Sequence, residues 1–132
     1  MAELTDAQRS FLRDNAYAGI VTTLRQDGSP HTTVVWVDEE GGDVVFNTAR
    51  GRAKDVNLEH DPRVSVLMID PNDQYKWVSV SGPAELSEDG ADAHIDKMAK
   101  KYLGVDEYPY RSAEETRVIV RVHPEKVSAS GF

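Results

Sequence analysis

The sequence contains no cysteine, and this absence removes several kinds of chemistry at once. Disulfide bonds, thiolate metal sites and cysteine nucleophiles are all excluded. A chain without disulfides suits a reducing compartment. Long apolar runs are absent too, because no stretch approaches the roughly 20 apolar residues that a membrane-spanning helix needs. We therefore expect neither a disulfide-stabilised scaffold nor a membrane protein.

Positive charge is scarce in this chain. It has 15 lysine and arginine residues against 23 aspartate and glutamate residues, which gives a formal net charge of −8. Proteins that bind nucleic acids or acidic membranes are usually basic, so we expect neither kind of partner. The first residues, Met-Ala-Glu-Leu-Thr-Asp, lack the positive start and apolar run of a secretory signal. These features predict a cytoplasmic protein whose acidity serves solubility.

The usual catalytic signatures are missing as well. There is no Gly-x-Ser-x-Gly elbow, no Walker loop and no Gly-x-Gly-x-x-Gly fingerprint. The four histidines show no metal-ligand spacing, so we expect no metal site. The acidic pairs Glu39-Glu40 and Glu114-Glu115 are predicted to lie in loops and to serve solubility. We therefore assign no catalytic residue, and a bound redox cofactor would supply the missing chemistry.

Alternating apolar and β-branched residues, separated by turn residues, predict strands over most of the chain. The expected strands are 18–24, 31–37, 43–48, 63–69, 75–86 and 116–122, and the tail 127–132 can add a short one. The first three should form an antiparallel meander, and Gly82-Pro83 should bend the long strand. The fold class is therefore mainly β: one domain, 1–132, built as a six-stranded antiparallel barrel whose closure removes exposed strand edges.

Three helices are expected between and around these strands. Thr5-Asp6-Ala7-Gln8 fits a capping box, which begins a first helix that ends near Asn15. A short second helix covers 51–60. The third is capped by Ser87 or Asp89, and Gly104 can close it. The helices should flank the barrel or cover one of its ends.

The segment 47–58 gathers three cations within five residues of an otherwise acidic chain. Arg50, Arg52 and Lys54 stand at the start of the second helix, where free amide groups and the helix dipole already carry positive charge. Cations there are mildly unfavourable unless an anion binds, so the segment is a candidate phosphate site. The alternative is a solvated basic turn whose cations pair with Asp55 or Glu59.

Two strands offer surfaces for the rest of a ligand. The strand 31–37 presents alternating side chains and backbone polar groups that suit a flat ring, although the same pattern fits ordinary core. In the strand 75–86, Trp77 points away from Val78 and Val80, which we expect to fill the barrel. A large aromatic residue outside a small barrel marks an interface or a ligand surface, unless a helix packs over it.

Several segments occur in a characteristic order. They are Gly19-Ile20-Val21-Thr22-Thr23-Leu24, Asp27-Gly28-Ser29-Pro30, 33–37, Arg52-Ala53-Lys54 with Asn57-Leu58, Asp61-Pro62-Arg63-Val64-Ser65-Val66, Trp77-Val78-Ser79-Val80-Ser81-Gly82-Pro83-Ala84-Glu85-Leu86 and 117–122. In this order and spacing the chain resembles the pyridoxamine-phosphate-oxidase-like split-barrel superfamily, of the FMN-binding split-barrel type, and in particular its F420-dependent branch. The similarity spans nearly the whole chain.

This resemblance implies a split barrel that forms a two-fold homodimer with two cofactor sites at its interface. The implied cofactor-binding residues are Arg52 and Lys54 at the phosphate, Asn47, Thr48 and Asn57 around that pocket, Thr33, Val34, Val35 and Trp36 along the ring, Trp77 and Ser79 from the partner subunit or at the ring edge, and Arg50 at the anionic tail of the cofactor.

The implied activity is hydride transfer between reduced coenzyme F420 and a small unsaturated or quinone-like acceptor, by proximity of a positioned ring and a stacked acceptor. An FMN-dependent oxidoreductase and a cofactor carrier without catalysis are the alternatives, because FMN and F420 present similar phosphate and ring parts. A longer basic groove, with Arg50 and Lys76 as candidates, would favour F420. The chain lacks the C-terminal residues that pyridoxine-phosphate oxidases use for substrate, so we expect no vitamin B6 oxidation.

Overall fold

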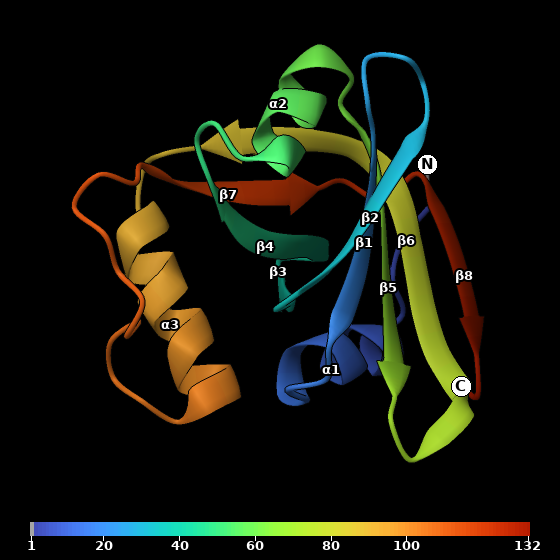
Figure 1. The fold of residues 1–132 in the computed structure, drawn as a ribbon. Coiled ribbons are helices and arrows are strands. Elements are labelled where there is room, and N and C mark those ends of the chain that lie inside the picture. Colours follow the sequence, from blue (N-terminus) through green and yellow to red (C-terminus); the bar gives the residue numbers. More distant parts are fainter. Residues whose placement is uncertain (1) are drawn as a thin grey trace.

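The computed structural model describes residues 2–132, and within them the predicted order of elements is confirmed, with the short strand expected in the tail present and one further strand, β3, added (Figure 1). The elements are α1 (Asp6–Asp14), β1 (Gly19–Leu24), β2 (Pro30–Val35), β3 (Asp38–Glu40), β4 (Asp43–Ala49), α2 (Ala53–His60), β5 (Arg63–Asp70), β6 (Asp73–Ser87), α3 (Ala91–Leu103), β7 (Arg117–Val122) and β8 (Lys126–Ser130). Eight strands therefore replace the six that were predicted, and the mainly β antiparallel split barrel is confirmed.

The long strand β6 joins the two halves of the barrel. Its first part pairs with β5 and β8, and its last residues, from Ala84 to Ser87, pair with β7. The change of partner falls directly after Gly82-Pro83, where the sequence predicted a bend. One half then runs β2-β1-β5-β6-β8 and the other β6-β7-β4-β3, with every described pairing antiparallel.

The predicted three-strand meander is wrong. β2 pairs with β1, but β4 pairs with β3 and β7 instead of with β2. The chain leaves the first half at Trp36 and inserts Val37, which is fully buried, into the core on its way to the second half. Burial of a valine side chain contributes about 1.5–3 kcal/mol, which favours this crossing path.

The acidic pair Glu39-Glu40 is not the solubility feature that the sequence predicted. Both residues belong to β3, and the Glu39 carboxylate is buried beneath α1. Arg9 and Arg13 of α1 hold it at 2.7 and 3.1 Å, and the Gly42 amide donates to it at 2.7 Å. These charged hydrogen bonds satisfy the buried carboxylate and attach α1 to the end of the barrel.

The helix termini follow the sequence in part. The capping box of α1 is confirmed, because the Gln8 amide donates to the Thr5 hydroxyl and the Thr5 amide donates to the Gln8 side chain. Gly104 ends α3 as predicted, in a left-handed conformation with φ 74°. The predicted caps Ser87 and Asp89 are wrong, since Gly90 stands at the α3 N-cap with φ 73°.

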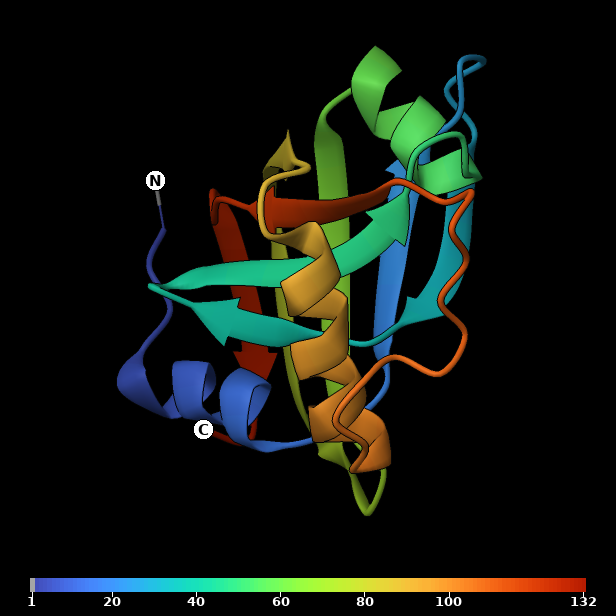
Figure 2. The same cartoon turned by 90° about the vertical axis from the view of Figure 1, so that its left-hand side faces the viewer.

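The two helices that matter for the site cover different parts of the barrel, α3 at the left and α2 at the top of Figure 1. α3 packs beside β4 and β7, and α2 packs near the ends of β1 and β4 (Figure 2). The core between the two halves is filled mostly by valines with Phe46 and Met68. The space left between α2, α3 and the end of β2 is where ligand-binding residues gather.

Candidate functional site

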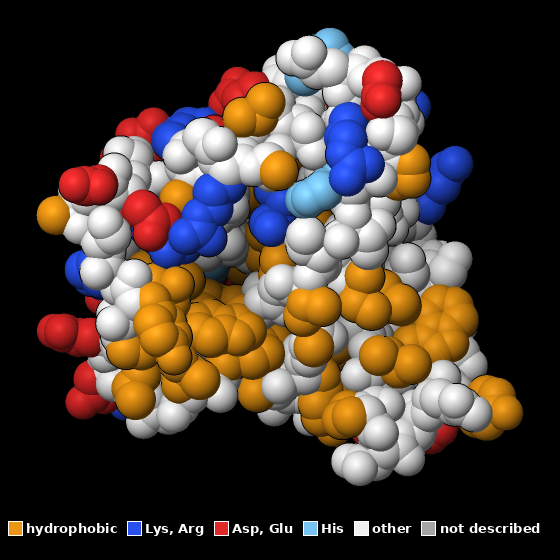
Figure 3. Space-filling model, viewed as in Figure 1, with side chains coloured by type: hydrophobic (Ala, Val, Ile, Leu, Met, Phe, Trp, Pro, Cys, Tyr) orange, Lys and Arg blue, Asp and Glu red, His pale blue; other side chains and the backbone are white. Residues whose placement is uncertain are grey.

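A cavity of about 210 Å³ opens between α2, α3 and the end of β2, above the strands β4 and β7. Figure 3 shows it as a hollow with Lys and Arg side chains above it and a broad hydrophobic area on the α3 side. Its walls are built from Val34, Val35, Trp36, Asn47, Thr48, Arg52, Lys54, Ile95, Met98, Tyr108, Tyr110 and Arg117. Six short segments, spread between residues 34 and 117, therefore meet at one place.

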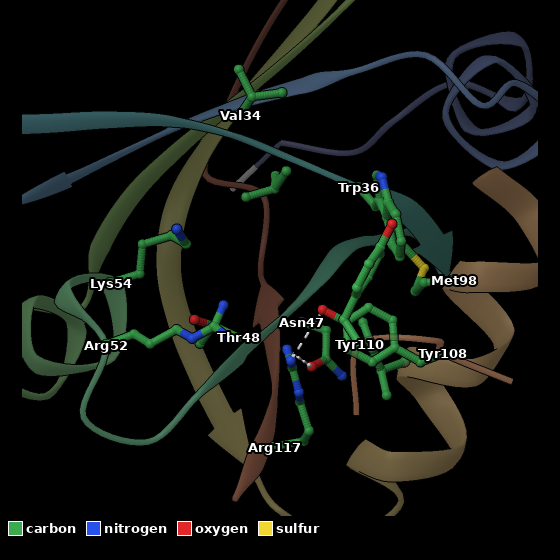
Figure 4. Close-up of a pocket in the computed structure, with 12 residues that line it drawn as sticks. Val34, Trp36, Asn47, Thr48, Arg52, Lys54, Met98, Tyr108, Tyr110 and Arg117 are labelled. Atoms are coloured by element: carbon green, nitrogen blue, oxygen red, sulfur yellow. Dashed lines mark hydrogen bonds between the residues drawn. The ribbon is translucent and has the colours of Figure 1, made fainter. Parts of the chain in front are cut away.

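The α2 side of the cavity is cationic. Arg52 is the N-cap of α2 and makes no side-chain cap, so the first amides of the helix lack the usual capping oxygen. Lys54, the second residue of the helix, points into the cavity and donates to the Thr33 hydroxyl at 3.0 Å (Figure 4). No carboxylate of residues 2–132 lies within ion-pair distance of its ammonium group. Partial burial, together with the nearby charge of Arg52, lowers the pKa of Lys54.

The floor of the cavity is polar and carries one unmatched group. Thr48 of β4 is 1% exposed, and its hydroxyl has no hydrogen-bond partner within the described part of the chain. A buried hydroxyl without a partner costs about 1–3 kcal/mol. It is the kind of group that a bound oxygen-rich ligand would satisfy.

Beside Thr48, the Asn47 amide links three elements. Its nitrogen donates to the Ala91 carbonyl and to His94 Nδ1 of α3, each at 3.0 Å, and its oxygen accepts from Arg117 of β7 at 3.5 Å. Burial lowers the pKa of His94, so the ring is neutral and Nδ1 can accept. Arg117 is only 7% exposed and also donates to the Tyr108 hydroxyl at 3.3 Å. Asn47 and Arg117 are thus held in fixed orientations at the cavity floor.

The opposite wall is aromatic. The Tyr108 ring lies edge-on to Trp36 and Tyr110, with ring centres 6.0 and 5.7 Å apart, and its face receives the Arg117 guanidinium at 4.8 Å. Trp36 is stacked on Tyr102 of α3 at 5.5 Å. Stacked and edge-on aromatic pairs of this kind are stabilising, so this wall is rigid.

Tyr102 fixes that wall from behind. Its hydroxyl donates to the Tyr17 carbonyl at 2.6 Å and accepts from the Val37 amide at 2.9 Å. Burial raises the pKa of Tyr102 to about 12, so it stays protonated over the physiological range and keeps both bonds. The crossing segment around Trp36 and Val37 is therefore anchored to α3.

The structure brings most of the sequence-predicted residues together. Val34, Val35, Trp36, Asn47, Thr48, Arg52 and Lys54 line the cavity, and Thr33 touches it through its bond to Lys54. Four others, Arg50, Asn57, Trp77 and Ser79, lie outside the cavity walls of this one chain.

Arg50 points away from the cavity into a group of carboxylates. It bonds Asp55 at 2.9 Å, Glu59 at 2.8 Å and Glu88 at 3.0 Å. The hydrogen bonds that Arg50 donates to Glu88 and Asp55 raise the pKa of its guanidinium group. Asp55 also accepts a hydrogen bond from the Gly51 backbone amide at 2.8 Å. Because Arg50 holds the same carboxylate, it stabilises the start of α2. The alternative of a paired basic turn therefore describes Arg50 but not Lys54.

Asn57 is buried on the inner side of α2. Its amide donates to the Thr23 hydroxyl of β1 at 3.0 Å and so ties the helix to the barrel. Trp77 and Ser79 lie on β6 between β5 and β8, where Trp77 faces Ile69 and Ser130 in the register. The neighbouring valines of β6 are buried in the core, as the alternation predicted, which leaves Trp77 on the outer side of the barrel.

Five cavity residues were not predicted from the sequence: Ile95, Met98, Tyr108, Tyr110 and Arg117. The two on α3 belong to its apolar stripe, which periodicity assigns to the core. The two tyrosines lie in the loop between α3 and β7, whose path a sequence does not specify. An arginine at the start of a strand directly after a tyrosine-rich loop was the one available signal for Arg117.

Across residues 2–132, no group of three or more His, Asp or Glu side chains is arranged to hold a metal ion. None of the helices within these residues is long and apolar enough to cross a membrane.

The fold is shared with known proteins. The family model described as pyridoxamine 5'-phosphate oxidase matches residues 4–131. A solved structure of an F420 reductase is 30% identical, with a TM-score of 0.79 over 90% of this chain and 94% of that one. A conserved hypothetical protein from Mycobacterium tuberculosis is 25% identical, with a TM-score of 0.74 over 96% of this chain and 84% of that one.

A heme binding protein from Mycobacterium smegmatis shares the fold at 22% identity and a TM-score of 0.68, over 96% of this chain and 54% of that one. No curated protein sequence matches the chain. The fold is therefore one that proteins with different bound groups have in common.

Proposed function

Because this chain belongs to the pyridoxamine 5'-phosphate oxidase family, we propose that it is an oxidoreductase that transfers a hydride between coenzyme F420 and a small unsaturated or quinone-like acceptor. The family assignment supports a flavin- or deazaflavin-dependent oxidoreductase. The similarity to an F420 reductase favours the deazaflavin. The observation that carries the proposal is the cation of Lys54, partly buried beside an unpartnered Thr48 hydroxyl and facing no carboxylate of residues 2–132.

The residues at this end of the cavity fit a phosphate group. Burying a cation costs free energy unless an opposite charge joins it. A phosphate beside Lys54 and Arg52 would offset that cost. It would also accept hydrogen bonds from the free amides at the start of α2 and from the Thr48 hydroxyl. Arg52 and Lys54 would therefore bind the phosphate, and Thr48 would orient it.

The other end of the cavity fits a flat ring. Val34, Val35 and Trp36 present backbone groups and apolar side chains where β2 ends, and Tyr108 and Tyr110 form the facing wall. F420, when bound and reduced, supplies the hydride. The chain's own contribution is to hold the ring in one orientation, to exclude water with the aromatic wall and to place the acceptor against the ring. No side chain is assigned as an acid or base.

The proposed cofactor site is completed by a second copy of the chain. At about 210 Å³ the cavity lies below the roughly 300–1,000 Å³ typical of small-molecule sites, and Val34 at its rim is 69% exposed. Trp77 and Ser79, if they contact the cofactor, must come from a partner subunit, since both lie away from the cavity of their own chain.

Sedimentation tests this homodimer directly. The purified chain, of 14.7 kDa, is expected to sediment with about twice that mass at micromolar concentration, with or without cofactor. A species that stays monomeric at every concentration, and also when saturated with cofactor, would contradict the shared site. The cytoplasmic location expected from the sequence stays a prediction.

One observation favours FMN as the second candidate cofactor. The cations expected to bind the glutamate tail of F420 do not extend the cavity. Arg50 is held by three carboxylates, and Lys76 lies over the rings of Phe11 and Phe132 at 5.8 and 5.1 Å. FMN, which lacks that tail, needs only the phosphate and ring sites. A carrier without catalysis would use the same contacts.

Titration with each cofactor separates these candidates. The fluorescence of the cofactor ring reports binding. We expect F420 to bind with a micromolar or lower Kd and FMN to bind more weakly. Turnover of F420H2 with a panel of quinone and enone acceptors then tests catalysis. Tighter binding of FMN would assign the protein to the flavin-dependent members, tight F420 binding without turnover would make it a carrier, and binding of neither would refute the proposal.

A further inference from the structure

The two cations that α2 contributes to the cavity, Arg52 and Lys54, differ in their partners. Lys54 faces no carboxylate of the described chain, whereas Arg52 already holds one. Arg52 Nη2 lies 2.7 Å from Glu115 Oε2, and Arg117 Nη2 lies 3.4 Å from the same oxygen. The Glu115 carboxylate therefore forms ion pairs with two guanidinium groups at the end of the cavity where the phosphate is proposed to bind.

Glu115 has a fixed backbone and a partly exposed side chain. It lies at the end of the loop that joins α3 to β7, which passes close to the start of α2 (Figure 2). Its backbone is fixed by the next residue, because the Arg50 amide donates to the Thr116 carbonyl at 2.8 Å. The side chain is 27% exposed and Arg52 is 51% exposed. The carboxylate can thus leave Arg52 by rotation of its own side chain, without movement of the sheet.

We propose that Glu115 is an internal competitor for the phosphate site, which holds Arg52 in the unliganded protein and is displaced when an anion binds. This inference rests on the proposed phosphate site and adds a residue that sets its affinity. A phosphate at Arg52 and Lys54 must either displace the Glu115 carboxylate or lie close to it, and both cost binding free energy. Glu115 therefore keeps the cationic site ordered when empty and makes cofactor release easier.

The chain provides a matched control at the preceding position. Glu114 is exposed, and among residues 2–132 its side chain takes part in no ion pair. Glu114→Gln and Glu115→Gln remove the same charge from adjacent positions, so a difference between them reports the contact with Arg52 and not the net charge. Both changes preserve side-chain size, and thermal unfolding verifies that each variant is folded.

The probe is inorganic phosphate, followed through the backbone amide resonances of residues 51–54, with F420 fluorescence as a second readout. Glu115→Gln is expected to bind phosphate about three- to tenfold more tightly than the unchanged chain, the scale of a partly exposed ion pair together with its repulsion of the ligand. Glu114→Gln should stay within about twofold. In an Arg52→Met background the Arg52–Glu115 pair is absent and only the longer contact of Glu115 with Arg117 remains, so the gain from Glu115→Gln should shrink to about twofold or less.

Three results would overturn the inference. The first is equal phosphate affinity of Glu114→Gln and Glu115→Gln. The second is weaker phosphate binding by Glu115→Gln, which would make Glu115 a residue that positions Arg52 for the ligand. The third is a full gain in phosphate affinity from Glu115→Gln that persists in the Arg52→Met background. The proposed function fails separately. If neither F420 nor FMN binds any variant but phosphate responds to Glu115→Gln as expected, the competitor stands and the oxidoreductase does not. If F420 binds and the two glutamine variants have equal phosphate affinity, the proposed function stands and the role of Glu115 as a competitor does not.

Discussion

Replacing Lys54 with methionine is expected to weaken binding of F420 by about 1.5–3 kcal/mol, or roughly 10- to 150-fold in Kd, while the folded chain stays as stable or becomes more stable. The loss follows from removal of a charged hydrogen bond to the phosphate. The gain in stability follows because the empty site holds a partly buried cation that faces no described carboxylate, and methionine removes that desolvation cost. Function and stability are thus expected to change in opposite directions.

The pH dependence of stability offers a second check on Lys54. Its pKa is lowered in the folded chain, chiefly by burial and then by Arg52, relative to its ordinary value of 10.5 in the unfolded chain. Between the lowered and the ordinary pKa, the unfolded state binds more protons, so stability gains a contribution that grows with pH through this alkaline window. Below the window the full cost of the buried charge is present. The Lys54→Met variant should lack this contribution.

Arg50→Met is the informative contrast for Lys54→Met. Arg50 is a cation of the same segment, but it is tied to Asp55, Glu59 and Glu88. Its removal is expected to lower the unfolding free energy by about 1–2 kcal/mol and to change F420 affinity less than Lys54→Met does. Fluorescence titration and urea denaturation of both variants give the comparison. Unchanged F420 affinity in Lys54→Met would refute the phosphate site.

Replacing Gly82 with alanine is expected to destabilise the fold by about 3 kcal/mol or more, which is a large part of the 5–15 kcal/mol typical of a domain. A methyl group at this position would collide with the His123 carbonyl oxygen, and the His123 carbonyl carbon and the Glu125 amide nitrogen are also close, at 3.0 and 3.2 Å. These are backbone atoms, which cannot rotate away as a side chain can. The segment between β7 and β8 crosses β6 here, at the corner where β6 changes from one half of the barrel to the other.

Thermal and urea unfolding measure this loss, and Ser81→Ala provides the control. Ser81 is the preceding residue of β6, and its side chain makes no hydrogen bond within residues 2–132. Its replacement should change stability by about 0.5 kcal/mol or less, whereas Gly82→Ala should lower Tm by about 10 °C or more. Equal stability of the two variants would show that the β7–β8 segment can move away from the corner, contrary to the packing described above.

Much of the barrel could be predicted from local patterns. The alternation in 63–69 and 75–86, the capping box at Thr5 and the bend at Gly82-Pro83 all depend on residues close together in sequence, and each has its expected counterpart in the structure. β3 was missed because a three-residue strand is too short to show alternation. The meander was wrong because strand neighbours depend on where a buried residue such as Val37 finds its place in the core.

Periodicity, turn residues and charge clustering are local properties, and they were enough to predict the fold class, the cationic segment 47–58 and the strand end 33–36. Only the tertiary structure distinguished Arg50 from Lys54. Both are cations four residues apart, but Glu88 reaches Arg50 from 38 residues away and no described carboxylate reaches Lys54. It also brought Glu115 to Arg52 across 63 residues. The charge state, burial and partners of a side chain depend on such distant contacts, which chain folding establishes and which neighbouring residues do not encode.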